Sequence, residues 1–250
     1  MRHTSYGAFI CTSGFTLSVN TMQDHPRQIR SFVRREGRLT SGQQNNLDTL
    51  WPRYGLEVPE QPLDWDEIFG RSAPKTLEIG FGAGEVLATL ATQQPDHDFI
   101  GIEVYRAGVG RLLGRLQAAA ADNVRVFCSD AAQLLSQAFA SASIDNVLLY
   151  FPDPWPKKRH HKRRIVQPHF ADEVARILVP GGTWRLATDW SNYAEHMRAV
   201  LDAHSQFENI GDDDGWVSNP PRTTTRFETR GVGKGHTVRD LAYRRIIERS

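Results

Sequence analysis

The chain has 250 residues, a formal net charge of +1 and an ordinary apolar fraction, which together indicate a globular protein. Its two cysteines, Cys11 and Cys128, are too few for a disulfide framework, and no apolar run approaches the ~18 residues of a membrane span. The apolar patch at the start is too broken for a signal peptide, so we expect a cytoplasmic protein. With so little net charge, any anionic partner must be attracted by local clusters of charge.

The first part of the chain carries little pattern. Residues 1–26 lack clear periodicity, and we expect a variable, disordered segment there, followed by a single domain over residues 27–250. Residues 27–38 contain five Arg and one Glu, which is typical either of a solvated arm or of a patch that binds phosphates. Residues 40–70 are rich in Pro, Trp and Asp, which predicts loops with one short helix.

From about residue 76 onward the pattern becomes strand, turn and helix, repeated. Strands are predicted at 75–80, 99–104, 124–130, 144–151 and 182–189, and helices at 85–94, 106–121, 131–140, 169–179 and 190–204. The run VPGG before the fifth strand predicts a turn. Strands that alternate with helices predict an α/β fold with a mostly parallel sheet covered on both faces.

In open α/β sheets, ligands bind beyond the carboxyl ends of the strands, so the end of each strand is informative. The first strand ends in LEIGFGAGE, with Glu78 two residues before Gly80; glycines here allow a tight turn and close approach of a ligand. The second ends at Glu103, which suits ribose hydroxyls, and the third at Asp130, which suits an adenine amino group. The glycines alone also fit simple turn geometry, but three acids in register predict a nucleoside site.

The same residues indicate which nucleoside binds. A dinucleotide site would carry G-x-G-x-x-G, whereas this chain has Glu85 at the last position. Glu78 would repel a pyrophosphate but attract the ammonium and sulfonium groups of S-adenosylmethionine. This is typical of a Rossmann-like class I methyltransferase, whose seven-stranded sheet is mostly parallel with the last strand antiparallel. Segments 207–212 and 241–247 are expected to supply the last two strands.

The fourth strand ends in the unusual stretch YFPDPWPKKRHHKRR. Pro152 and Pro154 restrict the backbone around Asp153, which predicts a rigidly held carboxylate facing the methyl group rather than a plain loop residue. The fifth strand ends at Asp189, a second acid on the same rim. Residues 157–164 contain six Lys or Arg and two His, a run that is often only a solvated face. Because it borders the pocket, we expect it to contact several phosphates, with strong salt dependence.

Together, LEIGFGAGE, FIGIEV, YFPDPWPKKRHHKRR, ATDW and TTTRFETRG resemble the bacterial tRNA (guanine-N7-)-methyltransferase family. The resemblance runs from about Arg27 to the C-terminus, and its most specific part is the acid between prolines followed by the basic run. It implies transfer of a methyl group from S-adenosylmethionine to N7 of a guanosine in the variable loop of tRNA, forming 7-methylguanosine.

The resemblance also implies residue roles. The methyl donor would be bound by Glu78, Gly80, Glu103, Asp130 and Asp153, of which Asp153 would be catalytic. The substrate would be contacted by Lys157, Asp189, Thr225, Arg226, Phe227 and Glu228, and the RNA by Arg159, His160, His161, Lys162, Arg163 and Arg164. No other His or Cys has zinc-like spacing to the two histidines, so no metal is expected. Phe227 and Trp155 either stack on the base or fill hydrophobic gaps.

The chemistry itself requires little acid–base catalysis. Guanine N7 carries a lone pair and no proton, so the enzyme's main task is in-line positioning of a base pulled from its stack. Carboxylates cannot pair with the O6 and N7 acceptors, but they accept from the ring N–H and the 2-amino group. We assign this contact to Asp153 together with Asp189 or Glu228, and a nearby carboxylate also stabilises the developing cation.

Three alternative functions are less consistent with these residues. An adenine or other amino-methyltransferase acting on RNA would place an Asn or Asp before two prolines and an aromatic residue, whereas this chain has Pro–Asp–Pro–Trp. A nicotinamide-dependent oxidoreductase is disfavoured by Glu78 and the glycine spacing. A non-catalytic RNA-binding protein on this fold is disfavoured by the complete set of acids. The sequence leaves monomer and homodimer both open.

Overall fold

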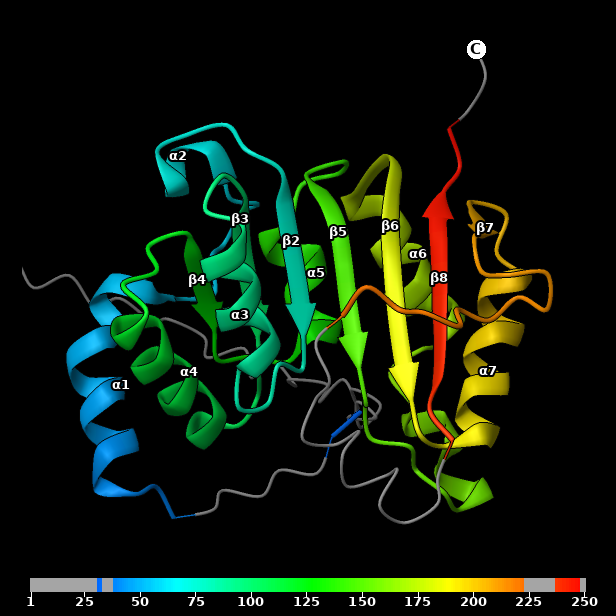
Figure 1. Cartoon of the computed structure of the whole chain (residues 1–250), viewed down its shortest axis with the longest axis horizontal. Helices are drawn as coiled ribbons and strands as arrows, with labels where there is room; N and C mark the ends of the chain where they lie inside the picture. The colour runs from blue at the N-terminus through cyan, green and yellow to red at the C-terminus, as the bar shows by residue number, and fades with distance from the viewer. Residues whose placement is uncertain (1–30, 33–37, 223–236, 248–250) are drawn as a thin grey trace, which may run out of the picture.

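The computed structural model describes residues 31–32, 38–222 and 237–247 (Figure 1). These residues form an eight-stranded sheet in the order β1-β4-β3-β2-β5-β6-β8-β7. The strands are β1 (Gly55–Leu56), β2 (Lys75–Ile79), β3 (Asp98–Ile102), β4 (Val124–Phe127), β5 (Ile144–Tyr150), β6 (Leu178–Thr188), β7 (Phe207–Asn209) and β8 (Arg239–Arg245). The segment expected to be disordered, residues 1–26, lies outside the described residues.

The predicted Rossmann-like α/β sheet is confirmed. All seven expected strands form, and β8 runs antiparallel to β6 and β7 while the pairs from β1 to β6 are parallel. The eighth strand is β1, which pairs with β4 through only two residues, Gly55 and Leu56. Two residues are too few for an alternating pattern, so the sequence gives no signal for this strand.

The helices are α1 (Ser41–Tyr54), α2 (Trp65–Phe69), α3 (Glu85–Gln93), α4 (Arg106–Ala118), α5 (Ala131–Ala138), α6 (Pro168–Ile177) and α7 (Ser191–Asp202), with the 3₁₀ helix η1 (Lys158–Arg163). The five helices expected between and after the strands are all present. The expectation for residues 40–70 was wrong in part, because α1 is a 14-residue helix there in addition to the short α2.

Helix α1 begins with a capping box, in which Thr40 and Gln43 satisfy each other's backbone N–H groups. It packs closely on α4 because that helix has glycines at the contact. A Cβ atom on Gly110 would lie 2.7 Å from the carbonyl oxygen of Gln43, and one on Gly114 would lie 2.5 Å from the side-chain nitrogen of Asn46. The close approach of two backbones therefore stabilises a helix whose own sequence is mostly polar.

The run VPGG does not form the predicted turn. Helix α6 ends at Ile177, and β6 begins at once with Leu178. The pairing with β5 then jumps, because Ile144 pairs with Leu178 while Asn146 pairs with Thr183. The glycines therefore permit a bulge within a strand, a feature that shares its residue preferences with turns.

The alternation of side chains along the strands divides the core between the two faces of the sheet. Leu77 and Ile79 of β2 belong to the apolar cluster that packs with α5, α6 and α7, while α1, α3 and α4 enclose a second cluster on the other face. Glu78, between these two residues, therefore points to the face that α3 covers. In β5, Tyr150 lies on the same face, where it clusters with Val86 of α3.

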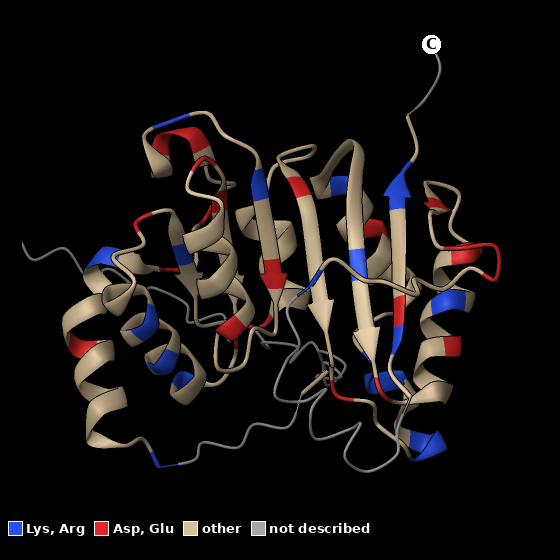
Figure 2. Cartoon of the chain, viewed as in Figure 1, with Lys and Arg blue, Asp and Glu red and all other residues tan. Residues whose placement is uncertain are grey.

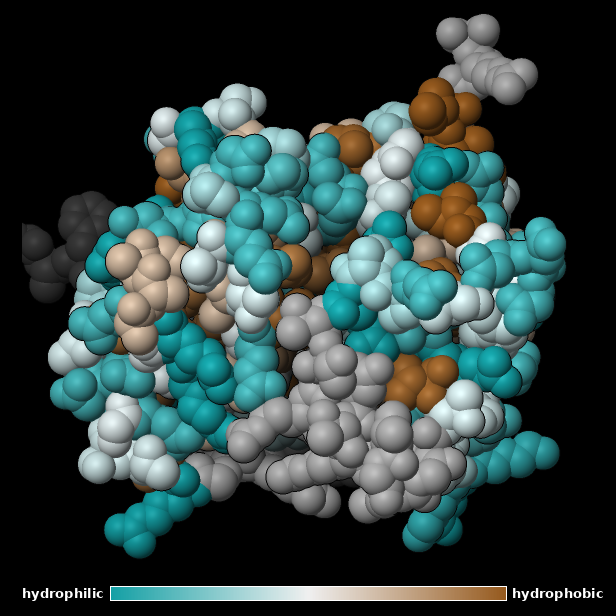
Figure 3. Space-filling view, in the orientation of Figure 1, coloured by the Kyte–Doolittle hydropathy of each residue, from teal (hydrophilic) through white to brown (hydrophobic). Residues whose placement is uncertain are grey.

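The face viewed in Figure 3 is mostly hydrophilic, with hydrophobic side chains gathered near the end of β8. There Ile246 and Ile247 are 39% and 62% exposed. Among the helices of the described ranges, none combines the length and the apolar character needed to cross a membrane.

Candidate active site at the carboxyl ends of the strands

The register of the sheet brings the predicted acids to one edge. Ile79 of β2 pairs with Ile102 of β3 and with Leu149 of β5, and Tyr150 of β5 pairs with Ala187 of β6. These strands therefore end at nearly the same level, and Figure 2 shows acidic residues near their ends. The predicted residues that follow these pairs are Gly80, Glu103, Asp153 and Asp189.

Glu78 is a buried carboxylate with an unsatisfied oxygen. Its residue is only 4% exposed, and its Oε2 atom has no hydrogen-bond partner among the described residues. Burial raises its pKa to about 8, the charge of Glu103 adds to this shift, and the backbone N–H of Leu87 partly offsets it. A cationic group placed beside Glu78 would supply the missing partner and favour the ionised form.

Two glycines of the turn after β2 have different structural roles. Gly84, at φ +70°, is where α3 meets α4, because a Cβ atom there would lie 2.5 Å from the Leu112 side chain. Gly80 also has a positive φ, of +74°, but a Cβ atom there would meet nothing within 4 Å. Gly84 is therefore required for packing, whereas Gly80 borders open space at the end of the strand, where a ligand can approach the backbone.

Some of the hydrogen-bond acceptor sites of Glu103 and Asp130 are occupied by backbone N–H groups of the protein itself. Glu103 accepts from the N–H of Gly82 at 2.8 Å through Oε2, and from Val104 and Tyr105 at 2.7 and 3.0 Å through Oε1. Burial raises its pKa, these three N–H groups lower it, and the nearby Asp153 raises it again. A carboxylate has about four acceptor sites, so one on Oε2 remains for a ligand. Asp130 caps α5, since its Oδ1 accepts from the N–H of Ala132 at 3.1 Å.

Asp153 is exposed at the centre of a strained turn. The residues on either side of the Pro-Asp-Pro segment, Phe151 and Trp155, have φ angles of +51° and +45°. Residues other than glycine rarely adopt this backbone conformation, and such strain is concentrated at functional sites. Asp153 therefore lies between two unfavourable backbone conformations as well as between two prolines, and contacts with the rest of the protein must hold this turn.

Trp155, which follows the turn, is a packing residue. It is 9% exposed, and its Nε1 donates to the carbonyl oxygen of Ser31 at 2.8 Å. The guanidinium of Arg163 lies 4.2 Å from the centre of its ring, and His160 meets the ring at a right angle. These contacts favour the gap-filling role over stacking on a base.

The basic run forms η1, at the lower right of Figure 2. The exposed cations at this position are Lys157, Lys158, Arg159 and Lys162. Partial burial, and then the charges of its cationic neighbours, lower the pKa of His160. The lowered pKa disfavours the charged form of this ring, and the lysines and arginines of η1 are its permanent cations.

Arg164 does not belong to this cationic surface, which corrects the sequence prediction. It is 2% exposed, its Nε donates to the carbonyl oxygen of Pro154 at 3.0 Å, and one terminal nitrogen donates to Oδ1 of Asn192 at 2.8 Å. The guanidinium also lies 4.7 Å from the centre of the Tyr193 ring. Because its donors are directed into the protein, it is not available to RNA phosphates.

Sequence reasoning also missed a buried ion pair beside the site. Arg222 donates to both carboxylate oxygens of Asp240, at 2.6 and 2.8 Å, and the two side chains are 4% and 9% exposed. The same guanidinium lies 5.6 Å from the centre of the Tyr150 ring and 5.5 Å from that of Phe151. No sequence pattern links two such residues, because only the pairing of β8 with β6 brings them to the end of β5.

The remaining predicted substrate residues are only partly placed. Asp189 is half-buried and directly follows β6. Thr225, Arg226, Phe227 and Glu228 lie outside the described residues. Among the residues that the structure does describe, no group of three or more His, Cys, Asp or Glu side chains could hold a metal ion.

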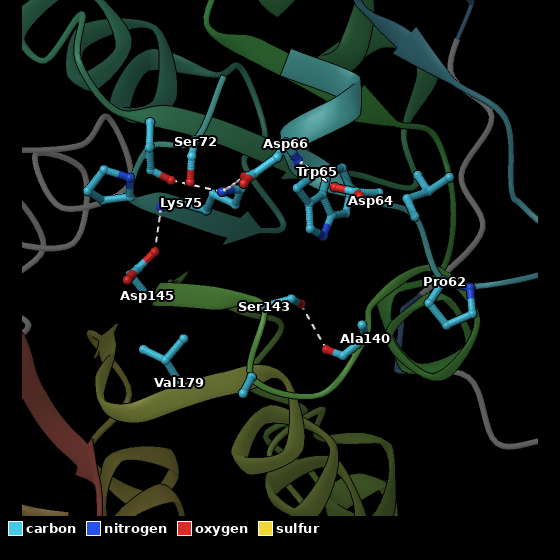
Figure 4. Close-up of a pocket in the computed structure, with 14 residues that line it drawn as sticks. Pro62, Asp64, Trp65, Asp66, Ser72, Lys75, Ala140, Ser143, Asp145 and Val179 are labelled. Atoms are coloured by element: carbon cyan, nitrogen blue, oxygen red, sulfur yellow. Dashed lines mark hydrogen bonds and ion pairs between the residues drawn. The ribbon is translucent and has the colours of Figure 1, made fainter. Parts of the chain in front are cut away.

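A cavity of about 790 Å³ lies at the opposite edge of the sheet (Figure 4). It is lined by the residues that begin the strands, including Lys75 and Asp145, and by the segment around α2. Nζ of Lys75 lies 2.5 Å from Asp66, and the backbone N–H of Lys75 donates to Asp145 at 2.7 Å. These charged groups join α2 and the strands to one another, and the cavity is separate from the acids at the carboxyl ends.

Comparisons with known proteins agree with this arrangement. Residues 72–241 match a family model described as "Putative methyltransferase". The chain is 52% identical over 221 residues to a tRNA (guanine-N(7)-)-methyltransferase of Halorhodospira halophila, covering 88% of this chain and 96% of the relative. It is 54% identical over 221 residues to a protein of the same name from Alkalilimnicola ehrlichii, covering 88% and 93%.

Among solved structures, the antibiotic-resistance methyltransferase Kmr is similar in fold, with a TM-score of 0.52 at 16% identity over 74% of this chain and 93% of that one. At this identity the similarity concerns the fold alone. The identity to the curated relatives is far higher and extends over nearly their whole length. The chain therefore belongs to the tRNA (guanine-N(7)-)-methyltransferase family.

Proposed function

We propose that this protein transfers a methyl group from S-adenosylmethionine to N7 of a guanosine in the variable loop of tRNA. The observation that carries the proposal is the buried Glu78, whose Oε2 atom has no hydrogen-bond partner among the described residues and which lies two residues before the open turn at Gly80. Identity of more than 50% to tRNA (guanine-N(7)-)-methyltransferases supports the choice of tRNA and of N7. The variable loop rests on the family resemblance, and the cytoplasm is the compartment that this function implies.

The residues at the strand ends fit the methyl donor. Glu78 accepts from the ammonium group and balances its charge, while the open space at Gly80 admits the donor next to the backbone. Glu103 uses its remaining acceptor site for a ribose hydroxyl, and Asp130 lies at the start of α5 to meet the adenine amino group. When bound, S-adenosylmethionine supplies an electrophilic methyl group on a sulfonium.

The exposed Asp153 then binds the Watson–Crick edge of the guanine. Its carboxylate accepts from the ring N–H and the 2-amino group, together with Asp189 or Glu228, and this leaves N7 directed toward the methyl group. The methylated base is cationic, so the same carboxylate stabilises charge that develops in the transition state. N7 has no proton to lose, and positioning therefore accounts for most of the catalysis.

The cations of η1 lie directly after this turn and hold the RNA backbone. Lys157 and the exposed Lys158, Arg159 and Lys162 are free to follow the phosphates because their side chains extend into solvent. Arg226 and Phe227, which precede Glu228, are proposed to contact the flipped base and its neighbours.

The test is methyl transfer from labelled S-adenosylmethionine to unmodified tRNA, followed by digestion and identification of the nucleosides by mass. We expect 7-methylguanosine, and in Asp153→Asn a fall in turnover of about 10²-fold or more, as for loss of a group that orients the reacting base. A methylated adenosine would instead assign the protein to the amino-methyltransferases. Binding of tRNA without any methylation would indicate a non-catalytic RNA-binding protein.

A further inference from the structure

The turn that presents Asp153 cannot hold its own shape. Phe151 and Trp155, at φ +51° and +45°, both adopt a backbone conformation that is unfavourable for residues other than glycine. Strain of this kind persists only where the surroundings fix it. The contacts of the turn with the rest of the protein therefore decide where the Asp153 carboxylate lies.

On one side, Arg164 ties the turn to α7. Its Nε donates to the carbonyl oxygen of Pro154 at 3.0 Å, directly before the strained Trp155. Its other nitrogens reach Asn192, with the shorter bond, of 2.8 Å, to the side chain. Its guanidinium lies over the ring of Tyr193, which is fully buried and accepts at its hydroxyl from the N–H of Val166. Asn192 and Tyr193, which Arg164 contacts, both lie in the first turn of α7.

On the other side, Arg222 ties the turn to β8. Its guanidinium lies over the rings of Tyr150 and Phe151, so it contacts the side chain of the strained residue. The double hydrogen bond to Asp240 fixes the plane of the guanidinium, and Asp240 is paired in register with Ala187 of β6. The carbonyl oxygen of Ala187 accepts from the N–H of Phe151 at 2.8 Å, which closes the link back to the turn.

We propose that Arg164 and Arg222 are positioning residues, which hold the Asp153 turn from its two sides in the geometry required for methyl transfer. The proposal rests on the proposed function, because it takes Asp153 to be the residue that binds the base. It explains why a run of cations whose first three members are exposed ends in an arginine directed into the protein. A displacement of about 1 Å at a reacting group can lower the rate by about 10²-fold, so the loss of either contact should act on turnover.

The substitutions Arg164→Lys and Arg222→Lys keep the charge but remove the planar set of donors, so they test geometry rather than electrostatics. We expect kcat to fall by about 10- to 100-fold in each, while KM for tRNA and the affinity for S-adenosylmethionine, measured by calorimetry without RNA, change less than about threefold. Asn192→Ala is a milder second variant that removes one acceptor and leaves Arg164 in place. We expect an intermediate fall in kcat.

Arg176→Lys is the matched control. Arg176 donates to the carbonyl oxygens of Leu135 and Phe139, both at 2.8 Å, and so joins α5 to α6 away from the strand ends. We expect it to lower Tm while leaving kcat unchanged. The proposal is overturned if Arg164→Lys and Asn192→Ala are folded but have the kcat of wild type. It is also overturned if the control Arg176→Lys loses as much turnover as Arg164→Lys and Asn192→Ala.

A measurement without turnover separates this proposal from the proposed function. Hydrogen exchange of a peptide covering residues 148–157 reports the amide of Phe151, which donates to the carbonyl oxygen of Ala187. We expect exchange at least tenfold faster in the two arginine variants and unchanged in Arg176→Lys. If wild type proves inactive on tRNA, the proposed function fails, and unchanged exchange in these variants would independently reject the two arginines as the support of the turn.

Discussion

Replacing Glu78 by Gln should change how the stability of this protein depends on pH. Glu78 is fully buried, and its pKa rises from 4.5 to about 8, chiefly because burial disfavours the charged form. A carboxyl group with a raised pKa stabilises the folded state below its unfolded pKa, and this contribution is lost as pH rises through the folded pKa. Gln is neutral at every pH, so the Glu78→Gln variant should not lose stability in this way as the pH rises.

The size of the effect follows from the two pKa values. Each pH unit between them removes about 1.4 kcal/mol, so wild type should lose about 3 kcal/mol between about pH 5.5 and about pH 8.5. In a domain of this size, that corresponds to a fall in Tm of about 10 °C. The buried amide has its own cost, but that cost does not vary with pH and leaves the comparison of slopes intact.

The assay is thermal unfolding of wild type and Glu78→Gln at both pH values, with and without S-adenosylmethionine. Glu60→Gln, which makes the same change on an exposed residue, is the control. We also expect Glu78→Gln to bind S-adenosylmethionine at least about tenfold more weakly, since the variant cannot balance the ammonium charge. Its Tm should therefore rise less when the donor is added.

Equal pH slopes of Tm in wild type and Glu78→Gln would refute the reasoning, because they would mean that Glu78 ionises as easily in the folded chain as in the unfolded one. A steeper slope in the variant would be equally inconsistent with it. If the slopes differ as expected but binding of S-adenosylmethionine is unchanged, the burial of Glu78 is correctly described and its role toward the donor is wrong.

Three further predictions concern other parts of the molecule. Replacing Arg159 and Lys162 by Gln should raise KM for tRNA and reduce the slope of log affinity against log salt by about 0.7–0.9 per lost phosphate contact, and an unchanged slope would exclude them from the RNA interface. Gly84→Ala should destabilise by about 2–4 kcal/mol in urea unfolding, from its φ of +70° and its 2.5 Å clash, while Gly42→Ala, in open space within α1, should not destabilise. Burial raises the pKa of the Cys128 thiol, so alkylation of Cys128, distinguished from Cys11 by peptide mass, should be slow at about pH 8 in the native protein and fast in urea; fast native labelling of Cys128 would contradict this.

The sheet and the edge that carries the acids were predictable because they depend on local patterns. Short apolar runs separated by helical segments define parallel strands, and the rule that ligands bind at the carboxyl ends then selects Glu78, Glu103 and Asp153 without any knowledge of contacts. The glycines were also visible in sequence. Their separate tasks were not, because only the packing of Leu112 against Gly84 distinguishes it from Gly80.

Other features were decided by tertiary structure. Helix α1 is mostly polar, and it is held by the burial of Leu47, Leu50 and Tyr54 against α4 and by close approach to glycines of α4, more than 50 residues away in the chain. Arg164 reads in the sequence as one more cation of a basic run, yet a 3₁₀ turn directs it inward to Pro154 and Asn192. Arg222 and Asp240 meet only because β8 is inserted antiparallel beside β6.

The sequence by itself thus determined the order of the strands along the chain, the acids at their ends and the cations that follow Asp153, since each is a property of neighbouring residues. The tertiary structure decided which charges face solvent and which are buried, and with them the raised pKa of Glu78 and the support of the strained turn. The reason is physical: burial and pairing are set by residues distant in sequence, and no local pattern records the distances between them.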